Sequence, residues 1–394
     1  MNADRRLHIT MVNKYYAPHV GGVEAVVRQL SEGLVEHAGA HVHGLVSNEG
    51  RQRVDQTVCG VEVTRLSRQL SISSSPVAGA LPYELGRLST AGRMPDILNL
   101  HSPYPWGELS FLIAQPDVPS VVLYHSDIVR QRRLLVAYRP FLERFLDAVD
   151  LIMVSSPNMV VHSPFLAPRA DKCRVIPFGL PEGCFTPPPG VFELARQLRE
   201  ARGGRCIVLF VGRLVYYKGV DVLVRAMTEV DADLVLVGNG PLEDELRTLA
   251  RDIGVAGRVA FLPPVGYDEL SAWYRAADVL CLPSVARSEA FGLVQIEAHA
   301  AGTPVVSTDL PTGVPYANLH GVTGLVVPPR DAEALAVALR RLLRDDALRV
   351  RLGGQARARA LSEFTIPRMV EQTLQVYAEA VDVHASKQGS ASPR

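Results

Sequence analysis

Two basic residues follow an apolar run in a pattern that suits phosphate binding. Arg213 and Lys218 lie five positions apart, directly after the run at 206–211. An arginine can bridge two phosphate oxygens, and a lysine supplies a compact positive charge. At the carboxyl end of a strand, such a pair lies where open α/β sheets bind ligands. The alternative interpretation is two solvated surface cations.

Two glutamates, Glu289 and Glu297, lie eight positions apart across an expected loop-to-helix junction. Gly292 is expected to open the helix, whose first N–H groups can meet hydroxyls or phosphates. Glu297 lies between apolar neighbours, so its carboxylate requires a partner, and sugar or ribose hydroxyls are suitable donors. The Phe-Gly-Leu sequence at 291–293 and this strand–loop–helix setting make the pattern specific.

Glycines and histidines mark a second set of candidates in the first half of the chain. Gly21 and Gly22 open the first amphipathic stretch, where glycines admit a ligand close to the backbone and a helix N-terminus attracts an anion. A plain tight turn is the alternative. His125 and His101 each follow a strand, at the ligand-facing end of the expected sheet. This placement favours a functional role for His125 and leaves His101 open between function and structure.

Two further segments imitate ligand-binding motifs. The glycines at 238–240 follow a strand, but Glu243 takes the place of the third glycine of a dinucleotide fingerprint, which predicts an ordinary strand-to-helix turn. Asp231 and Asp233 resemble a DxD metal element but precede a strand, so they are interpreted as solvated carboxylates. The five cysteines are scattered without CxxC spacing, and no metal site is predicted.

Short apolar runs alternate with amphipathic stretches in both halves and predict an α/β fold with two doubly wound parallel sheets. The proline-rich stretch at 181–190 reads as an interdomain linker. We predict an N-terminal domain at 1–184, a C-terminal domain at 185–366, a helix at 367–385 and a disordered tail at 386–394. The expected strands are 7–12, 41–47, 61–66, 97–100, 120–124, 151–155 and 173–176, then 206–211, 234–237, 259–262, 279–282, 305–308 and 324–327.

Composition excludes several classes of function. The 394 residues carry 41 Lys and Arg against 41 Asp and Glu, so the excess of basic residues typical of a nucleic-acid binder is missing. Apolar residues make up 47%, an ordinary globular share. No apolar run is long enough to span a membrane or to form a signal-peptide core. A cytoplasmic protein is therefore expected, with contact at the inner membrane face left open.

The motifs together resemble glycosyltransferase family 4, the retaining enzymes of GT-B fold. The resemblance runs from 21–24 through 212–219 and 289–297 to 321–325. It implies two Rossmann-like domains facing a central cleft, with an acceptor-binding first domain and a nucleotide-sugar donor in the second. It also implies that the last helix crosses back to the first domain.

The resemblance also implies roles for individual residues. Arg213 and Lys218 match positions that neutralise the donor diphosphate, aided by the N–H groups of Gly21 and Gly22. Glu289 matches a contact to the sugar, and Glu297 matches the ribose contact. The backbone around three residues matches contacts to the sugar and the adjoining phosphate: Phe291, Gly292 and Leu293. His125 matches a histidine beside the transferred sugar, and no catalytic metal or cofactor is implied.

The implied reaction is the metal-independent transfer of a hexose to a hydroxyl acceptor, with retention and with the acceptor attacking the face that the diphosphate leaves. The segments 284–291 and 309–315 resemble bacterial enzymes of surface polysaccharide, several of which use GDP-mannose, while UDP-hexose users share the pattern. The acceptor is soluble or lipid-linked. Five arginines beside His125 fit either a lipid phosphate or a solvated helix face: Arg130, Arg132, Arg133, Arg139 and Arg144. The alternatives are a nucleotide-sugar epimerase and a non-catalytic sugar-nucleotide binding protein.

Overall fold

The chain folds into two compact units in this computed structural model. The first comprises Met1–Gly179 with Ile366–Arg394, and the second comprises Leu180–Thr365. The structure describes residues 6–19, 21–72, 75–89, 94–127 and 132–391, without the side chains of 132–137 and 390–391. The chain leaves the first unit a few residues before the expected boundary at 184. It returns almost where expected, at residue 366.

The first unit contains an eight-stranded sheet in the order β10-β9-β8-β7-β1-β2-β4-β3. All neighbouring strands are parallel except the edge pair β3 and β4. A separate antiparallel pair is formed by β5 and β6. The strands are β1 (His8–Asn13), β2 (His41–Ser47), β3 (Val54–Val58), β4 (Val61–Leu66), β5 (Leu70–Ile72), β6 (Ser75–Val77), β7 (Ile97–Ser102), β8 (Ser120–Tyr124), β9 (Leu151–Val154) and β10 (Cys173–Val175).

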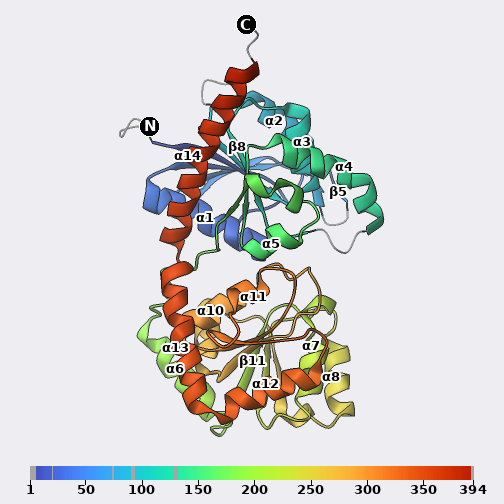
Figure 1. Ribbon diagram of the computed structural model, residues 1–394, viewed down its shortest axis with the longest axis vertical. Helices are drawn as coiled ribbons and strands as arrows, with labels where there is room; N and C mark the ends of the chain where they lie inside the picture. The colour runs from blue at the N-terminus through green and yellow to red at the C-terminus, as the bar shows by residue number, and fades with distance from the viewer. Residues whose placement is uncertain (1–5, 20, 73–74, 90–93, 128–131, 392–394) are drawn as a thin grey trace. The chain divides into compact units, whose positions relative to one another are not determined.

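Helices cover this sheet on both faces, as the apolar runs of its central strands require. Every residue of β7, β8 and β9 is buried. One helix, α1, packs beside α14, and α3 packs between α2 and α4 (Figure 1). The helices of the first unit are α1 (Gly22–Ala38), α2 (Leu81–Arg87), α3 (Pro105–Ala114), α4 (Arg132–Ala148), α5 (Pro157–His162) and α14 (Ile366–Ala391).

The second unit contains a parallel six-stranded sheet in the order β13-β12-β11-β14-β15-β16. The order reverses between β11 and β14, which is the doubly wound arrangement predicted from the sequence. Its strands are β11 (Ile207–Val211), β12 (Asp233–Val237), β13 (Val259–Leu262), β14 (Val279–Leu282), β15 (Val305–Thr308) and β16 (Gly324–Val327).

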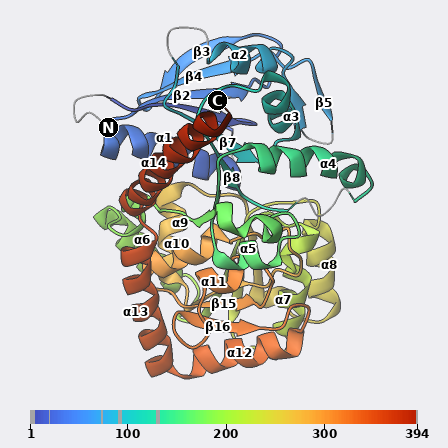
Figure 2. The same ribbon diagram turned by 45° about the horizontal axis from the view of Figure 1, so that its top comes forward.

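Two groups of helices enclose the second sheet. Helices α7, α8 and α12 share one apolar core with the strands, and α9 and α10 share another (Figure 2). The helices are α6 (Pro189–Glu200), α7 (Val220–Ala226), α8 (Glu243–Asp252), α9 (Tyr267–Ala276), α10 (Leu293–Ala301), α11 (Val314–Ala317), α12 (Ala332–Arg344) and α13 (Asp346–Glu363). No helix in the described residues is both long and apolar enough to span a membrane.

The C-terminal helix α14 corrects the predicted tail. The helix continues to Ala391, so a disordered segment starting at 386 is wrong for residues 386–391; residues 392–394 lie outside the described ranges. The polar composition of the segment suggested disorder, but tertiary contacts hold it. The Lys387 ammonium lies 2.7 Å from the buried carboxylate of Asp150, and His384 contacts the same carboxylate at 3.2 Å. Earlier in the helix, the Tyr377 hydroxyl accepts a hydrogen bond of 2.6 Å from the side chain of Asn99 on β7.

Candidate active site

The switch point of the second sheet gathers most of the predicted residues of that unit. Arg213 and Lys218 follow β11, and Glu289 lies in the loop that follows β14, the strand beside β11. A short 3-10 turn, Tyr216–Lys218, lies at the end of the loop that connects β11 to α7. A backbone hydrogen bond from Val285 N to Tyr217 O, at 2.8 Å, joins the two loops. The loops that follow β11 and β14 therefore meet at the switch point of the sheet.

Lys218 and Glu289 form a buried ion pair. Lys218 Nζ lies 2.6 Å from Glu289 Oε2, and the two residues are only 9% and 7% exposed. Ser284 donates a further hydrogen bond to the same carboxylate oxygen at 2.9 Å. Burial acts to lower the pKa of Lys218, but the carboxylate of Glu289 outweighs it and the pKa of Lys218 is raised. The ammonium is therefore charged and held in place, as phosphate binding requires.

Glycines allow these loops to approach each other. Gly219 has φ of +64°, and a Cβ atom there would overlap the carbonyl oxygen of Pro283 in the loop that carries Glu289. Gly238 has φ of +139°, and a Cβ atom there would overlap the carbonyl oxygen of Gly212. Because only glycine combines these angles with so little space, both positions fix the loop geometry. Gly238 lies in the strand-to-helix turn between β12 and α8, as expected.

Glu297 lies on α10, where a tyrosine holds it. The Tyr274 hydroxyl on α9 donates a hydrogen bond to Glu297 Oε2. Burial raises the pKa of Glu297, against the opposing effects of this bond and of the positive charge of Lys218. A small cavity of about 40 Å³ adjoins the pair and is lined by Cys184, Tyr267, Leu270, Ser271, Tyr274, Arg275 and Glu297. No sequence pattern distinguishes Tyr274, which is one apolar-face residue of the amphipathic helix α9.

The remaining residues predicted to bind the nucleotide-sugar donor in this unit differ in exposure. Arg213 is exposed, and within the described residues its side chain has no ion-pair partner. Gly292 caps α10 with φ of +76°, and Leu293 is the first helical residue. The first N–H groups of a helix have no partner within that helix, so this end can accept an anion. Phe291 is buried, and its carbonyl accepts a hydrogen bond from Gln295 at 2.8 Å.

Two histidines meet at the carboxyl ends of β7 and β8 in the first unit. Nδ1 of His101 lies 3.0 Å from Nε2 of His125. The two residues are 2% and 4% exposed. Burial lowers the pKa of His125 to about 3 and that of His101 well below its ordinary value. Both imidazoles are therefore neutral at physiological pH. Whether His101 has a functional or a structural role depends on its contact with His125.

The predicted anion site at Gly21 and Gly22 already holds a carboxylate. Gly21 caps α1, and the Glu24 side chain folds back over it so closely that a Cβ atom on Gly21 would collide with Glu24 Oε2. A negative group is favourable at a helix N-terminus. An incoming phosphate would have to displace Glu24, so the role of these two N–H groups stays a prediction.

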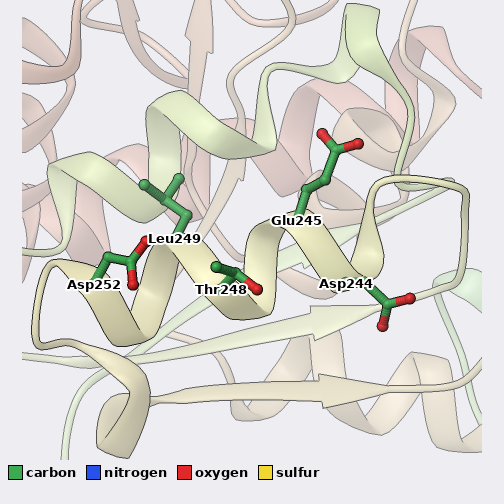
Figure 3. A pocket seen from close by; sticks show the side chains of 5 residues that line it. All are labelled: Asp244, Glu245, Thr248, Leu249 and Asp252. Carbon is green, nitrogen blue, oxygen red and sulfur yellow. The ribbon is translucent and has the colours of Figure 1, made fainter.

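The other candidates resolve as structural features. Arg205 pairs with Asp233 at 2.9 Å and with Asp231 at 2.6 Å, so the apparent DxD element is an arginine-bound turn. Figure 3 shows a shallow depression along α8, lined by Asp244, Glu245, Thr248, Leu249 and Asp252. The carboxylates of Asp244 and Glu245 point away from each other there. Within the described residues, no three His, Cys, Asp or Glu side chains are arranged to hold a metal ion.

The proposed basic surface beside His125 is described only in part. Arg130 and the side chains of Arg132 and Arg133 lie outside the described residues. Arg139 forms an ion pair with Glu143 at 2.8 Å on an exposed face of α4, and Arg144 is exposed. Contact with a membrane therefore stays a prediction.

Comparison with known proteins identifies the chain. The family model "Glycosyltransferase Family 4" matches residues 20–182, and "Glycosyl transferases group 1" matches residues 192–359. A D-rhamnosyltransferase of Pseudomonas aeruginosa is 36% identical over 89% of this chain and 90% of its own length. The chain belongs to glycosyltransferase family 4. An O-antigen chain mannosyltransferase of Escherichia coli is 33% identical, over 95% of this glycosyltransferase and 98% of its own length.

Solved structures confirm the GT-B fold of this family 4 enzyme. The sucrose-phosphate synthase of Thermosynechococcus elongatus superposes with a TM-score of 0.78 at 27% identity, over 95% of this chain and 99% of that one. An Anabaena protein solved in complex with UDP gives a TM-score of 0.75 at 20% identity, over 95% of this chain and all of that one, and supports the fold alone. The glycosyltransferase therefore has the two-domain GT-B architecture, with transfer from a sugar nucleotide as its general activity.

Proposed function

We propose that the enzyme transfers a manno-configured hexose from a GDP-linked donor to a hydroxyl of a growing polysaccharide, with retention of configuration and without a catalytic metal. The support for the sugar is the pair of relatives named for mannose and D-rhamnose transfer. D-rhamnose is 6-deoxy-mannose, so both sugars share the configuration at carbons 2, 3 and 4. A UDP-hexose remains the second donor to test.

The observation that carries the reaction is the buried pair of Lys218 and Glu289 at the switch point. Cleavage of the sugar–phosphate bond develops negative charge on the diphosphate. Lys218, Arg213 and the N–H groups at the start of α10 are suited to stabilise that charge without a metal. As the leaving phosphate moves onto these groups, the Glu289 carboxylate becomes available to sugar hydroxyls. Lys218 thus exchanges Glu289 for the phosphate, and Glu289 exchanges Lys218 for the sugar hydroxyls. This exchange links donor binding to the chemical step.

The bonds balance without any further reactant. The acceptor oxygen forms a bond to the anomeric carbon, and the bond from that carbon to the phosphate oxygen breaks. The proton of the acceptor hydroxyl passes to the departing phosphate on the same face. The sugar thus keeps its configuration, and the nucleoside diphosphate leaves. His125 is proposed to contact the transferred sugar, Glu297 to bind the ribose, and a lipid-linked acceptor to bring the enzyme to the membrane surface.

A donor panel tests the proposal. The full chain is incubated with GDP-mannose, GDP-D-rhamnose, UDP-glucose or UDP-N-acetylglucosamine, and slow hydrolysis is followed by mass spectrometry. We expect saturation with the GDP sugars and an α-configured product from an α-configured donor by NMR. Saturation by a UDP sugar alone would replace the donor assignment, and an inverted product would overturn retention. Inversion at a carbon of the sugar itself would indicate the epimerase alternative. Tight binding of a donor without turnover would indicate a binding protein.

A further inference from the structure

We propose that His101 is a positioning residue that fixes the tautomer of His125, so that His125 presents an N–H donor at Nδ1 to an oxygen of the bound sugar. The inference rests on the proposed function, because it takes His125 as the residue that contacts the transferred sugar. It assigns a role to a side chain outside the segments 21–24, 212–219, 289–297 and 321–325 that carry the resemblance. The role acts entirely through the contact between the two imidazoles.

The geometry of the two rings shows an edge-to-edge hydrogen bond. Nδ1 of His101 and Nε2 of His125 are 3.0 Å apart, and the ring planes are inclined by 19°. The ring centres are 5.3 Å apart, which is about the distance between the nitrogens plus the radius of each ring. The two centres and the two nitrogens therefore lie almost on one line. The two nitrogens therefore face each other in nearly the same plane. A single proton between them satisfies both atoms.

Burial restricts the protonation of the pair. Both residues are more than nine-tenths buried, and both pKa values are lowered by that burial. Each neutral imidazole carries one N–H group and one bare nitrogen. The location of the shared proton on one histidine therefore decides the location of the remaining proton on the other. Only two arrangements are compatible with the hydrogen bond.

The two arrangements differ in what they leave buried. Nε2 of His101 is a buried atom without a hydrogen-bond partner in the described part of the chain. If His125 donated, His101 would carry its proton on Nε2 and bury an N–H group that reaches no acceptor. If His101 donates from Nδ1, the buried Nε2 is only a bare acceptor. Orphaned N–H donors are rarer in folded proteins than under-used acceptors, so the second arrangement is favoured.

The surroundings of His125 hold its ring in this orientation. Its backbone N–H donates to Ser102 O at 2.8 Å, which joins the end of β8 to the end of β7. The ring of Phe178 lies against its other side, with centres 5.8 Å apart. Within the described residues, the hydrogen bond of the His125 ring is made at Nε2, so a proton on Nδ1 is available to a ligand. With Nε2 accepting from His101, His125 can donate but cannot accept.

This arrangement selects what His125 can bind. An N–H donor requires a lone pair on the ligand, which any hydroxyl, ring or glycosidic oxygen of a sugar supplies. The reversed tautomer would instead require a hydroxyl proton from the ligand. His101 thus controls whether His125 donates to the sugar or accepts from it, at a position that His101 itself does not reach.

NMR of the full chain labelled with ¹⁵N-histidine tests the pairing without any activity. Long-range ¹H–¹⁵N spectra distinguish protonated from bare ring nitrogens in each imidazole. We expect the proton of His125 on Nδ1 in the wild type and its migration toward Nε2 in His101→Leu. His101→Asn retains an N–H donor near the former Nδ1 position and should restore the wild-type pattern. His125 protonated on Nε2 in the wild type, or unchanged in His101→Leu, would overturn the proposal.

Kinetics of donor hydrolysis then separate the inference from the function on which it rests. We expect kcat/KM to fall about tenfold in His101→Leu, the size of one hydrogen bond, with most of the loss recovered in His101→Asn. His43→Leu is the matched control, because His43 bonds Thr64 elsewhere on the same sheet. Equal losses in all three variants would indicate a merely structural role. The expected NMR pattern without turnover of any sugar nucleotide would count against the proposed function alone.

Discussion

The ammonium of Lys218 lies 2.6 Å from the carboxylate of Glu289, and both residues are buried, with 9% and 7% of their surface exposed. A buried pair of this kind stabilises little by itself, but removing one member leaves an uncompensated charge. The pair therefore gives one mutation two separable effects, on folding and on catalysis.

Lys218→Met should lower the stability of the second unit by about 3 kcal/mol and reduce donor turnover roughly a thousandfold. Combining it with Glu289→Gln removes the unpaired charge, so stability should return while turnover stays lost. Thermal unfolding and donor hydrolysis measure the two effects. Lys172→Met is the control, because the Lys172 ammonium donates to the backbone carbonyls of Leu146 and Asp147 in the first unit. Recovery of turnover in the double variant would contradict the proposed role of Lys218.

Tyr274→Phe should weaken donor binding with little effect on kcat. The hydroxyl of Tyr274 stabilises the ionised form of Glu297, so its loss should raise the pKa of Glu297 further. We expect the Kd for the free nucleoside diphosphate to rise about tenfold, measured by calorimetry. Tyr267→Phe provides the comparison, since its hydroxyl contacts the thiol of Cys184 in the same cavity. Equal effects of the two substitutions would argue against a specific role for Tyr274.

Gly219→Ala should damage both folding and activity. The substitution strains the backbone at φ of +64° and drives a methyl group into the loop that carries Glu289. Gly254→Ala imposes similar strain at φ of +76° where the space is open. We expect the control to lose about 1 kcal/mol of stability, and Gly219→Ala to lose at least 2 kcal/mol more and most of its turnover. Denaturant unfolding and hydrolysis rates check this difference, which comparable losses in both variants would refute.

Glu108→Gln should change how stability depends on pH. Burial raises the pKa of Glu108 to about 7, against the hydrogen bonds from Ser102 and Tyr104. Because the folded-state pKa exceeds the unfolded value, this contribution is fully present below about pH 4.5 and is lost as pH rises to about 7. The loss is on the order of 3 kcal/mol.

Urea unfolding at pH 5 and pH 7.5 measures this effect. Glu108→Gln should make the stability difference between the two pH values smaller by about 2 kcal/mol, the part of the loss that falls between them, because glutamine does not ionise. Glu36→Gln, at an exposed position on α1, should leave the difference unchanged. An unaltered pH dependence in Glu108→Gln would show that Glu108 is ionised throughout.

Much of this fold follows from local patterns in the sequence. Thirteen strands of the two large sheets were predicted to within two residues, because parallel strands of such sheets are continuous apolar runs. The strand β3 was missed because its residues are mainly exposed and polar at the sheet edge. The β5–β6 pair was missed in a serine-rich segment that reads as a loop.

Lys218 and Glu289 were singled out from the sequence because each follows an expected strand. The pairing of those two strands, β11 and β14, comes from the structure and not from the alternation of strands and helices. Tyr274, Ser284 and the contact of His101 with His125 were not predictable in this way. Each depends on the packing of side chains from separate elements, and their positions in the sequence carry no distinguishing pattern.

The first unit is assembled from both ends of the polypeptide, whereas the second is one continuous segment. Ile366 and Val370 of α14 pack tightly against Gly33 on α1. The hydroxyl of Tyr377, also on α14, accepts a hydrogen bond from Asn99 on β7. During synthesis, α14 cannot cover these surfaces of α1 and the first sheet until residues 366–391 have been made. The second unit can therefore complete its folding before α14 is made, and truncation before Ile366 would uncover the face of the first unit that α14 contacts.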